Sequence, residues 1–143
     1  MASTFTLEIY TPYRLFFSEM VEMVILTIED GEIGIEAGHD RFTAPVKCCA
    51  ARIKDKTGNW KTAFISDGII EVKRHKSIVF VDDAEWPEEI DYERVLKSKK
   101  SAEDVLKSGA FKFEAAAAKQ KLLRVEARLK ALRSSSNPPQ SLL

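Results

Sequence analysis

The residues best suited to chemistry in this 143-residue chain are few and scattered. Its only histidines are His39 and His75, and His39 precedes Asp40, an order compatible with an acid–base pair. No candidate serine or reactive cysteine motif accompanies that pair, so nucleophilic catalysis is not indicated. Two separated histidines also lack the spacing of metal ligands. We therefore interpret both histidines as surface or interface residues.

Glycines punctuate the segment Gly31-Glu32-Ile33-Gly34-Ile35, and Gly38 follows it. Glycine-rich loops that cradle phosphates read GxxxxGK(S/T) or GxGxxG and stand before a helix. Neither motif occurs in this chain, and the glycines lie in a region that is expected to form strands. We expect them to form tight turns.

The two cysteines, Cys48 and Cys49, are adjacent. A disulfide between neighbours is strained, and two ligands alone do not make a zinc site. We expect both thiols to be reduced, one facing the core and the other facing outward.

The formal net charge of zero conceals an uneven distribution. Residues 1–90 carry 10 Lys and Arg against 16 Asp and Glu (−6), whereas residues 91–143 carry 12 against 6 (+6). The basic residues of the last predicted helix are Lys119, Lys121, Arg124, Arg128, Lys130 and Arg133. They form either a solvated helix face or a contact for an acidic protein, since a neutral chain without interleaved aromatics disfavours nucleic acid.

Up to about residue 84 the sequence favours strands. Residues 5–10 alternate apolar and polar side chains, which is typical of a half-buried strand. Further candidate strands separated by turn signals are residues 20–28, 31–35, 48–54, 60–66, 68–73 and 77–81. We predict an N-terminal antiparallel β-sandwich over residues 1–86.

From Asp91, a plausible N-cap, the apolar spacing becomes helical. Ser108-Gly109 interrupts it, and a second helix is expected over about 111–133. Its apolar seam is Phe111, Ala115, Ala118, Leu122, Val125, Leu129 and Leu132, with a flank of small residues at Ala116, Ala117, Ala127 and Ala131. This predicts an antiparallel coiled-coil hairpin over residues 87–133, so the fold class is α+β by segment.

Such a hairpin has little core of its own, so we expect it to be marginally stable unless docked, and able to switch between arrangements. The tail, residues 134–143, is rich in Ser and Pro and is expected to be disordered. No apolar run approaches the ~20 residues of a membrane span, and no secretory signal is evident. Membrane association is therefore expected only through a partner.

Several segments, in order, resemble the epsilon subunit of F-type ATP synthases. Residues 31–39 resemble the family's G-E-(I/L)-G-I-x-P-G-H, and residues 64–72 its (I/V)-S-G-G-(F/I)-x-E-V. Residues 90–94 are similar to its I-D-x-x-R-A. The resemblance covers about residues 5–133, with Ala37, Asp67 and Val95 as departures from the family pattern.

The resemblance implies a non-catalytic rotor-stalk subunit that couples ion flow through the c-ring to ATP synthesis. Its sandwich would attach to the gamma subunit and the c-ring through the loop that contains Glu32, Gly38 and His39. Its hairpin would lie compactly or extend toward the alpha/beta catalytic head and restrain ATP hydrolysis. Lys121, Arg124 and Arg128 would meet an acidic segment of a beta subunit, at the cytoplasmic face of a bacterial inner membrane. The alternative is a non-enzymatic interaction module in another assembly.

Some bacterial members of this family bind ATP as a regulatory ligand in the compact form. The matching residues here are Glu85, Asp91, Arg94 and Arg124. Ser101 and Gln120 stand where further basic residues are expected, which predicts weak or no nucleotide affinity. The alternative is structural: Asp91 caps the helix and Arg94 pairs with Glu93 or Asp91.

Overall fold

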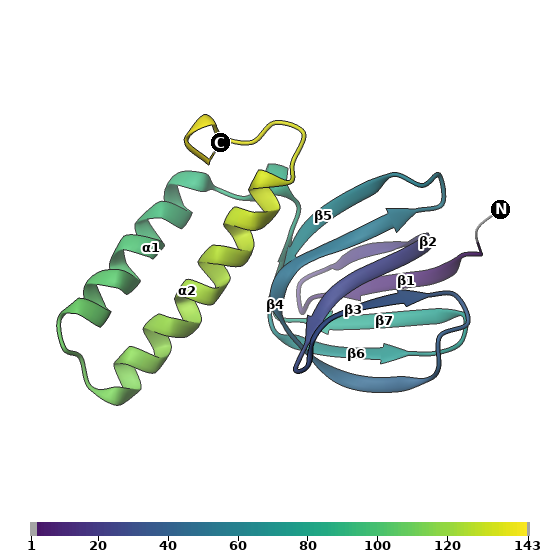
Figure 1. Cartoon of the computed structure of the whole chain (residues 1–143), viewed down its shortest axis with the longest axis horizontal. Helices are drawn as coiled ribbons and strands as arrows, with labels where there is room; N and C mark the ends of the chain where they lie inside the picture. Colours follow the sequence, from purple (N-terminus) through teal and green to yellow (C-terminus); the bar gives the residue numbers. More distant parts are fainter. Residues whose placement is uncertain (1–2, 143) are drawn as a thin grey trace.

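The structure is a computed structural model that describes residues 3–142. Eight strands come first: β1 (Phe5–Tyr10), β2 (Leu15–Ile28), β3 (Gly31–Glu36), β4 (Phe42–Asp55), β5 (Trp60–Ile65), β6 (Gly68–Val72), β7 (Lys76–Val81) and β8 (Ala84–Glu85). A 3₁₀ turn, η1 (Pro87–Glu89), leads to the helices α1 (Tyr92–Lys107) and α2 (Lys112–Arg133), and η2 (Gln140–Leu142) follows. Figure 1 shows the hairpin of α1 and α2 beside the strand domain.

The strands form one sheet that folds over on itself into a sandwich. Its order is β3-β2-β1-β7-β6-β4-β5-β8, and an additional β2–β4 pairing brings the two layers together. The expected fold class is confirmed, with one correction. Strands β1 and β7 run parallel, whereas the other described pairs are antiparallel. These two strands are far apart in sequence, so no tight hairpin forces them to be antiparallel.

Strands β2 and β4 are each 14 residues long because each pairs in both layers. The first part of β2 pairs with β1, and the part after Val21 pairs with β3. The first part of β4 likewise pairs with β6, and the part after Cys49 with β5. The expected strands at 20–28 and 48–54 were therefore the second halves of longer, bent strands.

The core is formed by alternate residues of the strands, such as Phe5, Leu7 and Ile9 of β1. The adjacent cysteines are free and point to opposite sides of β4. Cys49 packs against this core, as expected for one of the pair. Cys48 lies on the outer face of the sheet, as expected for the other cysteine. Helix α2 packs over this face, so Cys48 is only partly exposed to solvent.

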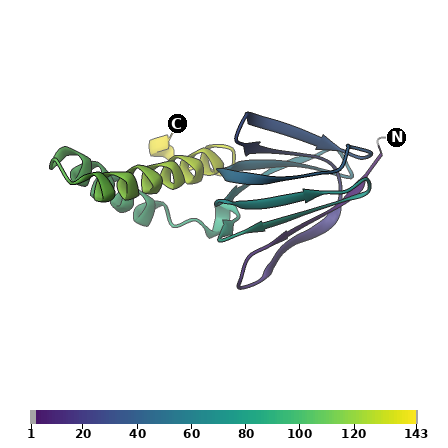
Figure 2. The same cartoon turned by 90° about the horizontal axis from the view of Figure 1, so that it is seen from below.

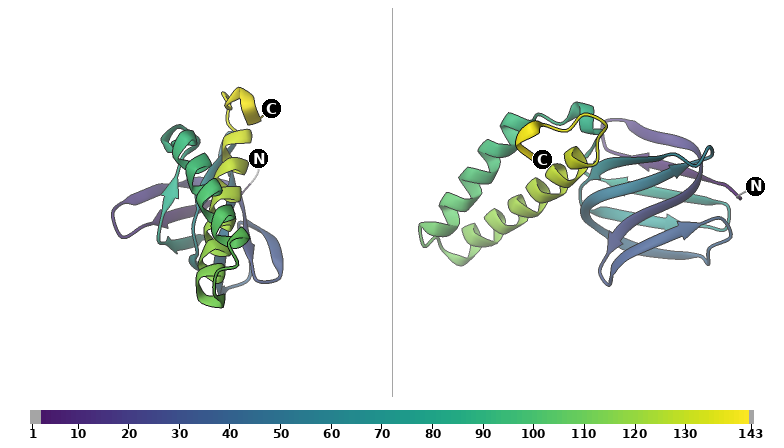
Figure 3. Two further views of the ribbon diagram at one scale, coloured as in Figure 1. Left: turned by 90° about the vertical axis from the view of Figure 1, so that its left-hand side faces the viewer. Right: turned by 45° about the horizontal axis from the view of Figure 1, so that its top comes forward.

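The hairpin begins and turns as the sequence predicts. The Asp91 carboxylate accepts a hydrogen bond from the Arg94 N–H at 3.2 Å, which confirms the N-cap. Helix α1 ends at Lys107, and Gly109 reverses the chain with a φ of +71°. Figures 2 and 3 show the hairpin leading away from the sandwich, with the turn between its helices at the far end.

Helix α2 buries less of its predicted seam than expected. Ala118, Val125, Leu129 and Leu132 are buried, but Phe111 is exposed. The small residues Ala127 and Ala131 are also buried, in a cluster that includes residues of β4 and β5. Two residues of the small-residue flank, Ala127 and Ala131, therefore lie against the sheet, whereas the other two, Ala116 and Ala117, are exposed.

The tail was expected to be disordered, but residues 134–142 have a defined course. The Ser135 hydroxyl donates a hydrogen bond to the Leu132 carbonyl. Leu142, in η2, packs against the same cluster that contains Ala127 and Ala131. The Ser141 and Tyr92 hydroxyls share a hydrogen bond, which ties the tail to the start of α1. Among the described helices, none is both long and apolar enough to cross a membrane.

Gly68 provides a test of the sandwich. It does not have a positive φ, but a Cβ there would lie 1.9 Å from the Phe80 carbonyl oxygen of the paired strand. Because backbone cannot move aside cheaply, we expect Gly68→Ala to lower the free energy of unfolding by about 2 kcal/mol or more. Urea unfolding measures this. Gly34→Ala is the control, because its Cβ would meet only side-chain atoms of Met23 and Ile25, none closer than 3.3 Å. An equal loss of stability in both variants would contradict the interpretation.

Candidate functional site

The hairpin docks on the sandwich around Arg128. Its Nε donates to Glu85 Oε1 at 2.6 Å, and its Nη2 donates to Asp83 Oδ2 at 3.1 Å. The guanidinium also lies over the Phe64 ring, 4.2 Å from the ring centroid. Phe64 is buried and the Arg128 and Glu85 side chains are mostly buried, whereas Asp83 is about half exposed. Charge-assisted bonds of this kind are stronger where water is partly excluded, so Arg128 holds α2 to the sheet.

Next to Arg128, helix α2 forms an apolar contact with the outer face of the sheet. Val125, Leu129 and Leu132 of α2 belong to one cluster with Phe64 of β5 and Val95 of α1. Cys48 lies beside it, with its Sγ 3.7 Å from the Leu123 carbonyl oxygen. Burial under α2 raises the pKa of Cys48 to about 12.

A cleft of about 320 Å³ opens beside Arg128, at the N-terminal end of α1. It brings together three of the residues of the predicted nucleotide site: Glu85, Asp91 and Arg94. Arg124 lines a neighbouring cleft of about 490 Å³, together with Lys121. Arg128 lines both clefts, and sequence reasoning did not assign it to the nucleotide site.

The electrostatics of the first cleft do not favour a phosphate. It contains four carboxylates, of Asp83, Glu85, Glu89 and Asp91, against the guanidinium groups of Arg94 and Arg128, a formal sum of −2. Glu85 is already paired with Arg128, and Asp91 caps α1. Arg94 forms no ion pair with any residue in the described part of the chain, so the expected pairing with Glu93 or Asp91 is absent.

The linker between sandwich and hairpin is fixed by Glu89. Its carboxylate accepts two hydrogen bonds from Arg14 Nη2, both at 2.9 Å, and one from the Trp86 N–H. The Arg14 hydrogen bond holds the pKa of Glu89 below its ordinary value, and the same contact raises the pKa of Arg14. The point where the hairpin leaves the sandwich is therefore tied down.

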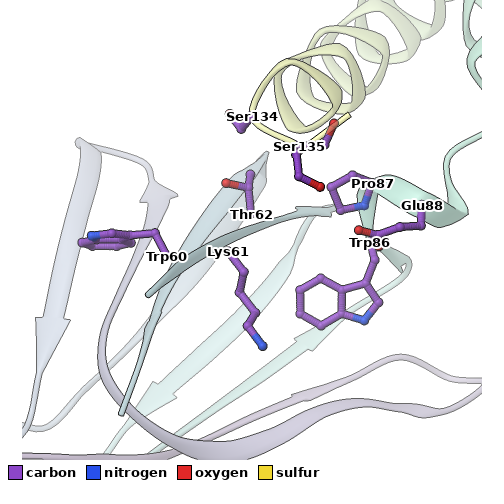
Figure 4. Close-up of a pocket in the computed structure, with 9 residues that line it drawn as sticks. Trp60, Lys61, Thr62, Trp86, Pro87, Glu88, Ser134 and Ser135 are labelled. Atoms are coloured by element: carbon purple, nitrogen blue, oxygen red, sulfur yellow. The ribbon is translucent and has the colours of Figure 1, made fainter. Parts of the chain in front are cut away.

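A second crease at this junction is drawn in Figure 4, where β5, the turn at residues 86–88 and the end of α2 meet. It encloses about 440 Å³. The Lys61 ammonium lies 5.7 Å from the Trp86 ring centroid, a cation–π contact that partly fills the crease. The lining residues include no nucleophile paired with a base.

Glu32, Gly38 and His39 were expected to form one loop. In the structure most of that segment is strand β3, with Glu32 near its start and Gly38 beyond its end. Glu32 forms an ion pair with Arg52 at 2.9 Å. Gly38 adopts a φ of +80°, as its predicted turn requires, and its N–H donates to the Arg74 carbonyl. The expected contact residues therefore lie at opposite ends of a strand.

His39 completes the turn after β3. Its Nδ1 lies 2.9 Å from the Asp40 carbonyl oxygen, and its ring lies 5.3 Å from the Phe42 ring centroid. The hydrogen bond is to the backbone of Asp40 and not to its carboxylate. The acid–base pair suggested by the order His39-Asp40 is therefore not formed.

A row of apolar side chains on the outer face of the sandwich was not anticipated. It crosses five neighbouring strands through paired positions: Leu15, Tyr10, Phe80, Ile69 and Pro45. The Tyr10 and Phe80 rings stack at 5.5 Å, yet Leu15, Ile69 and Phe80 remain 43–50% exposed. The available signal was the apolar residue at the outward position of each strand.

The comparisons with known proteins agree with this architecture. A model of the ATP synthase delta/epsilon chain β-sandwich domain matches residues 4–87. The ATP synthase epsilon chain of Caldanaerobacter subterraneus subsp. tengcongensis is 42% identical over 130 residues, which cover 91% of this chain and 94% of that one. The epsilon chain of Caldicellulosiruptor saccharolyticus is 46% identical over 102 residues, 71% of this chain and 74% of that one.

The chain belongs to the ATP synthase epsilon chain family. It is accordingly a non-catalytic subunit and not an enzyme. Two solved assemblies contain chains of the same fold. One is a mitochondrial ATP synthase of Euglena gracilis (TM-score 0.81, 20% identity, covering 92% of this chain and 83% of that chain). The other is the central stalk and c-ring of the Tetrahymena thermophila enzyme (TM-score 0.58, 14% identity, covering 91% and 97%).

For this epsilon chain, the structure separates the predicted basic residues into two groups. Arg128 is engaged with the sandwich, whereas Lys121 and Arg124 form no ion pair within residues 3–142. Sequence reasoning placed all three on one partner-facing surface. Helical periodicity alone does not indicate which basic residue the neighbouring sheet will neutralise.

The docking role of Arg128 is testable with the thiol that lies beneath α2. Arg128→Met keeps most of the side-chain bulk but removes the ion pairs, so we expect α2 to leave the sheet more often. Released from burial, Cys48 regains an ordinary pKa near 8.5, and its alkylation at pH 8 should quicken about tenfold.

Two controls frame this measurement. Lys130→Met removes an exposed cation of the same helix that forms no ion pair among the described residues, and it should leave the rate unchanged. Cys49, which is partly buried against the sandwich core and not under α2, should stay protected in every variant. If Cys48 and Cys49 became reactive together, the variant would be unfolding as a whole and the docking role would be wrong.

Proposed function

We propose that this chain is a rotor subunit of the ATP synthase central stalk. In this role it would help to couple ion flow through the c-ring to ATP synthesis. Family membership supports the assignment to the complex. The observation that carries the proposed attachment is the exposed apolar row on the sandwich.

The apolar row is suited to a permanent protein contact. Aromatic and aliphatic side chains that stay exposed side by side mark interaction sites, and aromatic residues often supply most of the binding energy. Phe80 and Tyr10 form the centre of the row, and Ile69 and Leu15 flank them. We assign this face to the gamma subunit, the partner that the epsilon family resemblance implies for the sandwich.

The ends of β3 are assigned to the foot of the stalk. Glu32 and the turn at Gly38 and His39 present mainly polar groups, which suits a contact with polar groups of another subunit. Glu32 is paired with Arg52, but both side chains are about half exposed, so that the pair is weak and exchangeable. We propose the c-ring as their partner, which would place the chain peripherally at the cytoplasmic face of a bacterial inner membrane.

The hairpin is the proposed regulatory part. In the docked form Arg128 is held by Asp83 and Glu85, whereas Lys121 and Arg124 form no ion pair with any of the described residues. An acidic segment of a beta subunit would offer Arg128 alternative carboxylates. Extension would then exchange one set of ion pairs for another and restrain ATP hydrolysis. Because salt screens the attraction between exposed charges, these contacts would be weak enough to modulate ATP hydrolysis without blocking it permanently.

A regulatory nucleotide would meet a cleft that is unfavourable to it. The four carboxylates beside Arg94 and Arg128 repel a triphosphate, and the family's additional basic positions are Ser101 and Gln120 here. We propose that any nucleotide binding at Glu85, Asp91, Arg94 and Arg124 is weak.

The attachment is tested by replacing two residues of the row, Ile69→Ser and Phe80→Ser together. Both side chains are nearly half exposed, so the sandwich should persist, while recovery of gamma subunit with the tagged chain should fall about tenfold or more. Trp60→Ser, an equally exposed residue near the end of α2, is the control. Unchanged recovery of gamma with the double variant would place the contact elsewhere; no recovery with the unaltered chain would favour a different assembly.

Nucleotide affinity is tested by calorimetry with the unaltered chain and with Arg94→Gln. We expect no saturable heat with ATP below about 1 mM in either protein. Tight binding that the Arg94 replacement abolishes would show that the guanidinium groups outweigh the carboxylates of the cleft.

A further inference from the structure

The turn between α1 and α2 ends in two unburied aromatic side chains. Phe111, the N-cap of α2, is 85% exposed, and Phe113 in its first turn is 86% exposed. Lys112 lies between them in the sequence. This end of the hairpin, which we call the tip (residues 107–114), lies away from the sandwich in Figures 1 and 2.

The two phenylalanines have no structural task in the docked chain. The buried residues of α2 begin at Ala118 and are concentrated from Val125 onward. Neither phenylalanine belongs to either of the two apolar clusters. A phenylalanine that becomes buried removes 150–250 Å² of largely apolar surface from water. Two exposed phenylalanines at the end of the hairpin could therefore contribute substantially to the binding of a partner.

The charge around the tip indicates the kind of partner. Residues 97–121 contain seven lysines against three acids, Glu103, Asp104 and Glu114, a formal sum of +4. None of these lysines forms an ion pair with another residue between 3 and 142. In contrast to Arg128, the cations of this half of the hairpin are all available to a partner.

We propose that the tip is a docking surface for an acidic protein surface that has an apolar pocket, with Phe111 and Phe113 as the anchors. A second copy of the chain is disfavoured, because the unpaired lysines of two tips would repel each other. A lipid surface is disfavoured because, beyond the two phenylalanines, the first turns of α2 offer only the small side chains of the four alanines 115–118 for insertion, between Glu114 and Lys119. The proposal rests on the proposed function in that the partner is a subunit of the same complex.

Cross-linking from the tip tests this directly. A photoreactive benzoylphenylalanine at position 113 of the full chain, assembled into the ATP synthase, should cross-link to another protein subunit. The yield should fall several-fold as salt is raised from about 0.05 M to about 0.5 M, because the surrounding contacts are exposed charges. Cross-links only to lipid, to a second copy or to the chain's own sandwich, or none at all, would overturn the proposal.

The energetic role of the anchors is tested with Phe111→Ser and Phe113→Ser together. Both side chains are exposed, so folding and gamma recovery should be unchanged. The concentration of chain that half-inhibits ATP hydrolysis by a complex depleted of it should rise about tenfold. Tyr13→Ser, which removes a 90% exposed aromatic residue from the sandwich, is the matched control.

The outcomes separate this inference from the proposed function. Normal gamma recovery with unchanged inhibition by the double variant would overturn the tip and leave the rotor role intact. If the unaltered chain did not inhibit hydrolysis, the proposed restraint would fail and the cross-linking result alone would decide the tip. Loss of gamma recovery by the unaltered chain would count against the rotor role itself.

Discussion

Helix α2 lies between α1 and the outer face of β4 and β5, and one small apolar cluster serves both contacts. Val125, Leu129 and Leu132 pack in the same cluster as Val95 of α1 and Phe64 of β5. Because α1 buries only Val95 and Ala102, it depends on α2 for its position. Release of α2 from the sheet would therefore free both helices together, which makes the position of the hairpin an all-or-none property.

The only ion pairs between α2 and the sandwich within residues 3–142 are those of Arg128. They join the acidic N-terminal part of the chain to its basic C-terminal part at one point. Of the 12 basic residues after residue 90, docking engages this one and leaves the others without an ion pair in the described structure. The docked hairpin therefore keeps nearly all of its positive charge, so docking does not remove its attraction for acidic partners.

The sequence was informative where a local pattern determines local structure. Alternation located β1, and the side-chain chemistry of Asp91 located the start of α1. It failed where a distant element decides. The first halves of β2 and β4 were missed because a strand that changes layers shifts its buried face. Phe111 was assigned to the helical seam, but it is the extended N-cap residue that precedes α2, so its side chain does not lie on that seam. Likewise, neither the apolar row nor the neutralisation of Arg128 can be inferred without knowing which strands are neighbours.

Docking and partner binding place different demands on the two ends of the hairpin. A partner that binds Arg128 must first compete with Asp83 and Glu85, so its apparent affinity is reduced by the free energy of docking. The phenylalanines of the tip are exposed while α2 is still docked and carry no such cost. A partner can therefore engage the tip first, which raises the local concentration of its carboxylates near the basic face of α2. The geometry thus favours an order in which tip contact precedes the release of Arg128.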